Sequence, residues 1–264
     1  MIDFAGRVAL VTGGGRGIGR STALVLARHG AAVAVVARST REVRAVAAEI
    51  REAGGRAMAV TADVASLAEV AHAVDAAART LGPVDLVVNN AGVMPLGAVA
   101  RSDPAEWTQA LLVNVAGAYH TTRAVLPAML ARGWGRIVNV SSALAGAAAS
   151  THRSAYVTSK AALDRLTVAV AAEVAGSGVT ANGVYPGMTD TALQRRLREA
   201  PGDAVGPEQQ AWYREQHARG RLHDPDAPAR LIAALAATTR NGEVIDIDGG
   251  EGRALLRAAA ARER

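Results

Sequence analysis

Short apolar runs alternate with longer alanine-rich stretches along most of the chain. Each run is only a few residues long and apolar at consecutive positions, which is typical of strands buried on both faces of a parallel sheet. The predicted strands span residues 8–11, 32–36, 57–60, 86–88, 137–140, 179–184 and 244–247. The stretches between them contain predicted helices at 41–53, 67–81, 106–131 and 155–175.

This alternation predicts the fold class. Strands and helices in regular succession form an α/β domain in which helices cover both faces of a parallel sheet. We therefore expect a single Rossmann-type, doubly wound domain with a seven-stranded parallel sheet. A chain of 264 residues is long enough for one such domain, with a sizeable core, to span residues 1–264.

Residues 191–226 interrupt the rhythm. The segment is charged, contains Pro201, Pro207 and Pro225, and has no strand-like run. Ligands of open α/β sheets bind at the carboxyl ends of the strands, so a polar insertion after the sixth strand is a candidate substrate lid. A pair of surface helices explains the same pattern equally well.

Composition narrows the function classes. Half of the residues are apolar but only 3% are aromatic, so the core is expected to consist of Ala, Val and Leu. Because the chain has no cysteine, disulfides, thiolate metal sites and cysteine nucleophiles are excluded, and we predict no metal site. Residues 1–4 do not resemble a secretion signal, and no apolar run approaches the ~18 residues of a membrane helix. We therefore expect a cytoplasmic protein that does not contact a membrane.

The net charge of +5 is spread over dispersed arginines that are not interleaved with aromatic residues. This distribution favours a solvated surface over nucleic-acid binding, so we expect no nucleic-acid partner. The densest basic cluster is the C-terminal tail, residues 252–264, which is either a docking helix or a frayed end.

Lys160 is the only lysine in the chain, and it follows Tyr156 by four residues in a predicted helix. Residues at this spacing share one face of a helix, so the phenol and the ammonium are expected to be neighbours. Lysine offers a compact charge with three rotatable donors, which arginine does not. A single lysine in a chain otherwise rich in arginine therefore indicates a chemical role.

A glycine-rich turn links the first strand to the helix that follows it. Glycines in such a turn let the backbone approach a pyrophosphate, which the unpaired N–H groups and the dipole of the helix then bind. The pattern is Gly-x3-Gly-x-Gly, which differs from the commonest dinucleotide fingerprint. The candidate residues are Gly13, Gly15, Arg16, Gly17, Ile18 and Gly19.

Together with Tyr156, Lys160 and the preceding Ser141-Ser142 pair, this turn resembles the short-chain dehydrogenase/reductase family. The resemblance is to the branch of about 250 residues and covers roughly residues 5–250. It implies an oxidoreductase that interconverts a ketone and a secondary alcohol by hydride transfer with a nicotinamide cofactor. Tyr156 would be the general acid and base, and Lys160 would lower its pKa and hold the ribose. Ser142 would bind the substrate oxygen, and Asn114 would bend its helix and hold a water beside the lysine.

The resemblance also implies cofactor-binding positions outside the glycine turn. Asp63, with Val64, would receive the adenine, although an aspartate at a strand end is more often a helix cap. The remaining positions follow the fourth and sixth strands: Asn90, Ala91, Gly92, Pro186, Gly187, Met188 and Thr189.

The end of the second strand bears on the choice of nicotinamide cofactor. NAD enzymes place a carboxylate there, whereas a 2′-phosphate requires arginine. The carboxylate position falls on Ala37, and Arg38 and Ser39 follow it. Arg16 would reach the same phosphate from the glycine turn, so we predict NADP(H).

The substrate is the least constrained element. The predicted pocket is mostly apolar and suits a small-molecule ketone or secondary alcohol; its residues are Met94, Leu144, Ala149, His152, Tyr185, Leu193 and Trp212. His152 would be either a second proton-active group or only a wall of the pocket. A 3-oxoacyl thioester on an acidic acyl carrier protein is the second candidate. The turn at 176–178 lacks the basic residue usual in reductases of that kind.

Two further possibilities concern the whole protein. A dinucleotide-binding regulator without turnover is the alternative of another class, but the intact Asn-Ser-Tyr-Lys set favours an enzyme. A sugar-nucleotide epimerase would need a different glycine spacing. The terminal strand at 243–248 and the alanine-rich helices favour subunit packing, so we predict a homotetramer, with a dimer as the alternative.

Overall fold

The sheet has the predicted number and direction of strands. The computed structural model describes residues 2–147 and 151–263. Its seven strands are parallel and lie in the order β3-β2-β1-β4-β5-β6-β7, which confirms the doubly wound α/β domain. The strands are β1 (Val8–Thr12), β2 (Ala32–Ala37), β3 (Ala57–Thr61), β4 (Leu86–Asn89), β5 (Gly135–Val140), β6 (Val179–Tyr185) and β7 (Val244–Asp246).

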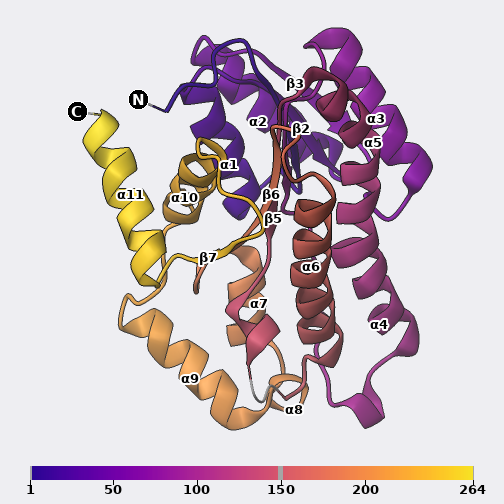
Figure 1. Cartoon of the computed structure of the whole chain (residues 1–264). Coiled ribbons are helices and arrows are strands. Elements are labelled where there is room, and N and C mark those ends of the chain that lie inside the picture. The colour runs from indigo at the N-terminus through magenta and orange to yellow at the C-terminus, as the bar shows by residue number, and fades with distance from the viewer. Residues whose placement is uncertain (1, 148–150, 264) are drawn as a thin grey trace.

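Helices cover both faces of this sheet (Figure 1). One face packs against α1 (Gly17–Arg28), α2 (Thr40–Glu52) and α10 (Asp226–Ala236). The other face packs against α3 (Leu67–Thr80), α5 (Gly117–Arg132) and α6 (Ser154–Glu173). Helix α4 (Pro104–Leu111) precedes α5 and contacts α6.

Alternation within β2 shows why this strand is apolar throughout. Val33 and Val35 face the core that contains α1 and α2, whereas Ala34 and Val36 face the core that contains α3 and α5. Each fully buried valine side chain contributes about 1.5–3 kcal/mol of transfer free energy. Since both faces are covered, a polar side chain in such a strand needs a buried hydrogen-bond partner, as Asn139 of β5 has in Thr167.

The predicted helix at 106–131 is not continuous. One turn of π-helix, Leu112–Ala116, separates α4 from α5 and contains Asn114. The side-chain amide of Asn114 bonds to the backbone of Val93, outside the helix. Such π-turns are often found at functional sites. The remaining predicted helices and strands are present with boundaries that differ by a few residues.

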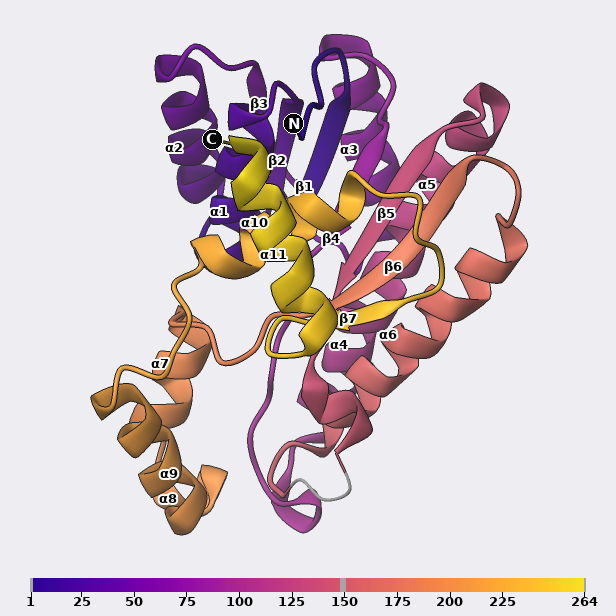
Figure 2. The ribbon, with the colours of Figure 1, turned by 60° about the vertical axis from the view of Figure 1, so that its left-hand side comes forward.

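Two segments that the sequence left open are helical. Residues 191–226 contain α7 (Ala192–Glu199), α8 (Gly202–Val205) and α9 (Pro207–Ala218), which project from one end of the domain (Figure 2). The basic tail forms α11 (Gly250–Glu263), whose Leu255, Leu256 and Ala259 pack on the core beside α10. Within the described part of the chain, no helix is both long and apolar enough to cross a membrane.

Candidate active site

Helix α6 brings Tyr156 and Lys160 together, as their spacing predicts. Both side chains are buried, and the Lys160 Nζ atom lies 5.7 Å from the centre of the Tyr156 ring. Nζ donates a hydrogen bond of 2.7 Å to the carbonyl oxygen of Val140, at the carboxyl end of β5. The lysine therefore connects α6 to the sheet edge where ligands of this fold class bind.

Asn114 connects the loop after β4 to α6. Its Nδ2 donates to Ser159 Oγ at 2.8 Å and to the carbonyl oxygen of Val93 at 2.9 Å, and its Oδ1 accepts from the Val93 N–H at 2.8 Å. A Cβ atom placed on Gly92 would lie 3.7 Å from Lys160 Nζ and 3.5 Å from Asn114 Oδ1. A glycine at this position leaves room beside both side chains.

The two serines after β5 have different partners. Ser141 is buried, and its hydroxyl donates to the backbone carbonyl of Lys160 at 3.3 Å. The Ser142 hydroxyl accepts from the Leu144 N–H at 3.2 Å and forms a side-chain hydrogen bond with Tyr156. The structure thus places Ser142 beside the phenol and gives Ser141 a packing role.

Burial dominates the electrostatics of this group. It raises the pKa of the Tyr156 phenol, and the hydrogen bond from Ser142 and the charge of Arg153 only partly oppose that rise. Burial also lowers the pKa of Lys160 to about 8, with Asp164 acting in the opposite direction. The expected lowering of the Tyr156 pKa by Lys160 is therefore not seen here, because desolvation outweighs it and the ammonium donates to Val140 instead. The phenol is in its protonated form at neutral pH.

The glycine turn at the start of α1 has the geometry expected of an anion site. Gly13 and Gly17 have positive φ values of 62° and 53°, and a Cβ atom on Gly19 would collide with the Gly13 carbonyl oxygen. Helix α1 has no side-chain cap and no acidic residue in its first turn, so its N-terminal N–H groups are available to a phosphate. Asn90 Nδ2 braces the turn through the carbonyl oxygens of Thr12 and Gly13, at 3.0 and 3.2 Å. This arrangement fits the pyrophosphate of a dinucleotide.

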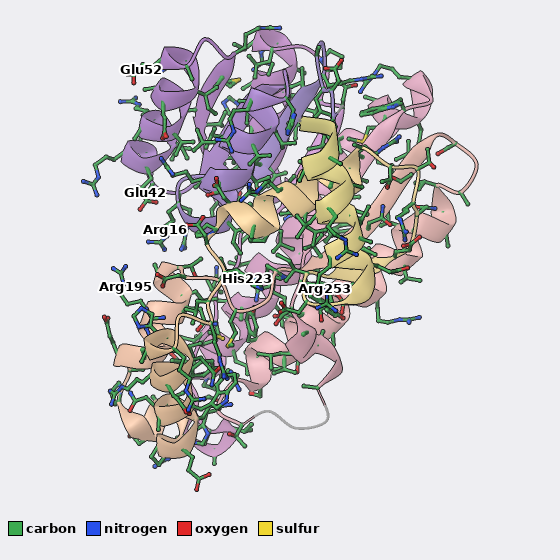
Figure 3. The ribbon with its side chains drawn as sticks, turned by 90° about the vertical axis from the view of Figure 1, so that its left-hand side faces the viewer. Arg16, Glu42, Glu52, Arg195, His223 and Arg253 are labelled. Carbon is green, nitrogen blue, oxygen red and sulfur yellow. The ribbon has the colours of Figure 1, made fainter. Side chains whose placement is uncertain are left out.

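The corner beyond the glycine turn holds two exposed arginines. Arg16 Nη1 lies 3.8 Å from Glu42 Oε1 (Figure 3), and Arg38 Nη1 lies 4.0 Å from Asp63 Oδ2. Ala37 ends β2 without a carboxylate, as the sequence indicates, and Ser39 caps α2. Glu42 is an acid that the sequence analysis did not place here.

The neighbouring adenine candidates also have local partners. Asp63 accepts from the Ala65 N–H at 3.0 Å, while Ser66, rather than Asp63, caps α3. The backbone carbonyl of Val64 contacts His120 Nδ1 at 3.0 Å.

The segment after β6 is fixed by His223, which the sequence analysis missed. Thr189 Oγ1 donates to the Pro186 carbonyl oxygen at 2.9 Å, and Gly187 has a φ of 65°. The His223 N–H donates to the Met188 carbonyl oxygen at 2.7 Å, and its ring contacts Asp248 Oδ1 at 2.9 Å. No sequence motif marks His223, because it is about 34 residues away from Thr189 and pairs with it only in the folded chain.

An apolar cluster surrounds the phenol. Tyr156 packs with Met94 and with three residues of the 191–226 segment, Leu197, Val205 and Tyr213. The partly buried residues around them are Leu96, Leu144, Met188, Leu193 and Ala200. Of the predicted pocket residues, the structure thus brings Met94, Leu144 and Leu193 together at Tyr156.

Other predicted pocket residues lie elsewhere. The Tyr185 hydroxyl donates to Asp164 Oδ2 at 2.7 Å, and Tyr185 is not part of the cluster. Trp212 is 45% exposed, whereas the next residue, Tyr213, is buried, because the register of α9 turns Tyr213 inward. Ala149 lies outside the described residues.

His152 and Arg153 stand at the entrance to α6. His152 has a φ of 61°, the only positive value among the described non-glycine residues, and its buried Nδ1 has no hydrogen-bond partner. Arg153 is 2% exposed and donates to the Tyr213 hydroxyl. Sequence reasoning missed Arg153 because a buried arginine is indistinguishable from a surface arginine in so arginine-rich a chain.

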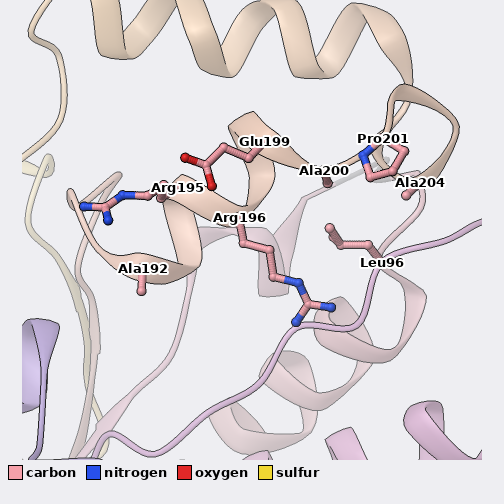
Figure 4. Close-up of a pocket in the computed structure, with 8 residues that line it drawn as sticks. All are labelled: Leu96, Ala192, Arg195, Arg196, Glu199, Ala200, Pro201 and Ala204. Atoms are coloured by element: carbon pink, nitrogen blue, oxygen red, sulfur yellow. The ribbon is translucent and has the colours of Figure 1, made fainter.

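An open pocket of about 390 Å³ lies along the 191–226 segment, and Tyr156 is not among its lining residues (Figure 4). It is lined by Leu96 and by residues of α7 and α8, including Arg195, Arg196 and Glu199. The pocket shares Leu96 and Ala200 with the apolar cluster around Tyr156. Within the described ranges, no three His, Asp or Glu side chains are arranged to hold a metal ion.

Comparisons with known proteins agree with this geometry. The sequence model of the short chain dehydrogenase family matches residues 7–202. The D-beta-hydroxybutyrate dehydrogenase of Cupriavidus necator is 36% identical over 93% of this chain and 97% of its own length. The 3-oxoacyl acyl-carrier-protein reductase FabG of Pseudomonas aeruginosa is 34% identical over 94% and 98%.

A solved structure is similar in three dimensions as well. The gluconate 5-dehydrogenase of Burkholderia cenocepacia, in complex with NADP and tartrate, superposes with a TM-score of 0.83 at 32% identity. The match covers 96% of this chain and 97% of that one. The glycine turn, the buried tyrosine–lysine pair and these matches lead to one assignment: the chain belongs to the short-chain dehydrogenase/reductase family.

Proposed function

We propose that the protein is an NADP(H)-dependent oxidoreductase that interconverts a ketone and a secondary alcohol, with Tyr156 as the acid and base. The observation that carries this proposal is the buried phenol of Tyr156, which lies beside Lys160 at the carboxyl end of the sheet. Membership of an oxidoreductase family that uses nicotinamide dinucleotides supports the reaction class.

The roles of the side chains follow from their positions. The nicotinamide cofactor, once bound, supplies or accepts the hydride. In reduction, the Tyr156 hydroxyl donates its proton to the carbonyl oxygen, and Ser142 donates a hydrogen bond to the same oxygen as negative charge develops on it. Lys160, with a pKa of about 8, is mostly an ammonium at neutral pH and stabilises the phenolate that remains. Asn114 keeps the loop after β4 in contact with α6.

Residues 191–226 act as the substrate lid in this proposal. Leu197, Val205 and Tyr213 form one buried cluster with Tyr156, so substrate entry would require this segment to move away from the phenol. An apolar cover also excludes water from the site of hydride transfer.

Arg38 and Arg16 support the preference for NADP(H). Both guanidinium groups are largely exposed beside the glycine turn, and Ala37 supplies no carboxylate for a ribose hydroxyl. Their contacts with Asp63 and Glu42 are long, at 4.0 and 3.8 Å, so a phosphate would compete well for the same groups.

The relatives support the carbonyl–alcohol chemistry but not one substrate. Their names cover a hydroxy acid, a sugar acid and a carrier-bound 3-oxoacyl thioester. The thioester is the second candidate, since the net charge of +5 would attract an acidic carrier protein. A non-catalytic, dinucleotide-binding regulator is the alternative of another class.

The decisive experiment is a substrate panel. For reduction, purified protein is mixed with NADPH or NADH and with simple ketones or 3-oxoacyl thioesters. For oxidation, secondary alcohols are tested with the oxidised cofactors. In both directions the absorbance of the reduced cofactor is followed. We expect turnover with NADPH that the Tyr156→Phe variant lacks. Tight NADPH binding without turnover of any compound would instead favour the regulator.

A homotetramer in the cytoplasm completes the proposal. The short strand β7 and the alanine-rich helices α5 and α6 are suited to packing against a second subunit. Light scattering at micromolar concentration is expected to give four times the chain mass of 27.0 kDa, and a monomer would contradict this part of the proposal.

A further inference from the structure

Arg153 carries a buried charge that the proposed reaction does not use. Its side chain is among the largest that are fully buried, with 2% of the residue exposed. Its Nη1 donates to the neutral hydroxyl of Tyr213, and its buried Nε has no partner. No carboxylate of the described residues lies within ion-pair distance of it.

Such an arrangement is costly unless something compensates it. A guanidinium has five donors in a fixed planar fork, and a buried charge is normally paired or fully hydrogen-bonded. Here Nη1 donates to the hydroxyl oxygen of Tyr213, whereas Nε is unpaired. Nε lies on the edge of the guanidinium that binds a carboxylate through two hydrogen bonds. An anion would pair with both the charge and the free Nε donor.

Arg153 lies close to the reaction site. Tyr213, its hydrogen-bond partner, belongs to the apolar cluster around Tyr156, and the Arg153 guanidinium carbon is 5.7 Å from the centre of the Tyr213 ring. Its charge also acts on the Tyr156 phenol. An anion bound to Arg153 would thus be held between the catalytic tyrosine and the lid.

The backbone around Arg153 is held in a strained, fixed conformation. His152 has a positive φ, and its carbonyl oxygen accepts from the Gly97 N–H at 2.9 Å, while Gly97 pairs with Arg153 as a short bridge. The orphaned His152 Nδ1 faces the lid, since a Cβ on Gly206 would lie 3.5 Å from it. Strain of this kind persists where the surrounding structure requires it, which is common in ligand-binding segments.

We propose that Arg153 binds a carboxylate of the substrate, so that the substrate is a keto acid or hydroxy acid rather than a neutral ketone. The carboxylate would take Nε and the adjacent Nη2 as donors, and Tyr213 would hold Nη1. This inference rests on the proposed function and narrows its substrate class. In this arrangement, the Tyr213 hydroxyl and the lid take part in recognising the carboxylate.

The test compares acids with their uncharged esters. The assay uses NADPH and compares wild type with Arg153→Met, Arg153→Lys and a control, Arg44→Met. Arg44 is an exposed arginine on α2. The substrates are 2-oxobutanoate, 3-oxobutanoate and 4-oxopentanoate, each beside its methyl ester. We expect wild type and the control to prefer at least one acid, and Arg153→Met to lower the acid-to-ester ratio of kcat/KM by about 30- to 100-fold. Arg153→Lys, which keeps the charge but not the two-point grip, should lie between them.

A binding measurement separates this proposal from the catalytic one. The corresponding hydroxy acids are titrated into NADPH-loaded protein, where no turnover occurs, and NADPH fluorescence is followed. The carboxylate site is supported if wild type binds the hydroxy acid, Arg153→Met does not, and Arg153→Lys binds it more weakly than wild type. This result would hold even if no substrate is turned over. Circular dichroism checks that each variant is folded. Equal losses for acids and esters, or a wild type without preference for any acid and without hydroxy-acid binding, would overturn the inference.

Discussion

We call the strand ends and helix α6 around Asn114, Tyr156 and Lys160 the floor of the active site. This floor and the lid, residues 191–226, are stabilised in different ways. On the floor, polar side chains find partners across elements: Asn114 bonds to Val93 and Ser159, and Asn139 bonds to Thr167 at 2.8 Å. The lid covers the phenol mainly through apolar contacts of Leu197, Val205 and Tyr213. A hydrogen-bonded floor suits chemistry that requires fixed geometry, whereas an apolar cover is suited to opening.

The distribution of unsatisfied atoms sharpens this contrast. Among the described residues, seven buried side-chain atoms have no partner, and two of them lie on Asn89 and Asp164. Four others belong to the lid or the segment facing it, on His152, Arg153, Arg198 and Gln209. The cofactor-binding turn, in contrast, is braced by Thr12 and Asn90. We infer that the floor determines the reaction and that the lid region determines which substrate is accepted.

The largest expected effect comes from the floor. Tyr156→Phe removes the proton donor while keeping the ring in the apolar cluster, so kcat should fall by about 10²- to 10⁴-fold. NADPH binding, measured by fluorescence titration, should be nearly unchanged. Tyr119→Phe, which alters an exposed tyrosine, serves as the matched control. Turnover by the Tyr156→Phe variant at the wild-type rate would show that another group supplies the proton.

Lys160 offers a test of the floor that needs no substrate. Burial lowers its pKa in the folded protein to about 8, so the unfolded chain binds the extra proton between pH 8 and the ordinary value of 10.5. The free energy of unfolding of wild type should therefore rise with pH across this window, relative to Lys160→Met, by on the order of 3 kcal/mol. The comparison is made by urea denaturation at several pH values. Parallel pH profiles for the two proteins would mean that Lys160 is not desolvated.

The sequence predicted the floor of the active site better than the lid. The strands, the glycine turn and the Tyr156–Lys160 pair depend on local periodicity and spacing, and the structure contains them as expected. The lid depends on which side of α9 faces the phenol, and the sequence analysis chose Trp212 where the structure buries Tyr213. One residue of helix register turns a side chain by about 100°, and only tertiary packing fixes that register.

The π-turn around Asn114 and the contacts of His223 show a second limit. The family resemblance implied that Asn114 bends its helix, but the sequence did not predict that Asn114 bonds to Val93, on another segment. His223 bonds to Met188 across the lid segment and carries no local signal. Features that join distant segments are beyond a reading of local patterns.

Substitutions at neighbouring positions on the lid would sharpen the comparison next. Tyr213→Ala removes a buried ring from the cluster over Tyr156 and the partner of Arg153, so the free energy of unfolding should fall by about 2–4 kcal/mol. Trp212→Ala, at an adjacent but exposed position, should cost less than about 1 kcal/mol despite the larger side chain. Urea denaturation of both variants gives the two values. A larger loss for Trp212→Ala would reverse the assignment of the inward face of α9.

The smallest expected effect lies at the cofactor corner, beside the glycine turn. Arg38 is largely exposed, and its contact with Asp63 is 4.0 Å long, so its removal should leave the fold intact. A charge-assisted contact with the 2′-phosphate of NADP(H) at a site this open contributes about 1–2 kcal/mol. Arg38→Ala should therefore weaken NADPH binding by roughly 5- to 30-fold and leave NADH binding nearly unchanged. Fluorescence titration with the two cofactors measures this, with Arg44→Ala on the same face of the sheet as the control. Equal losses for NADPH and NADH would show that Arg38 does not read the phosphate, and the preference would then depend on Arg16 alone, with Glu42 3.8 Å from it.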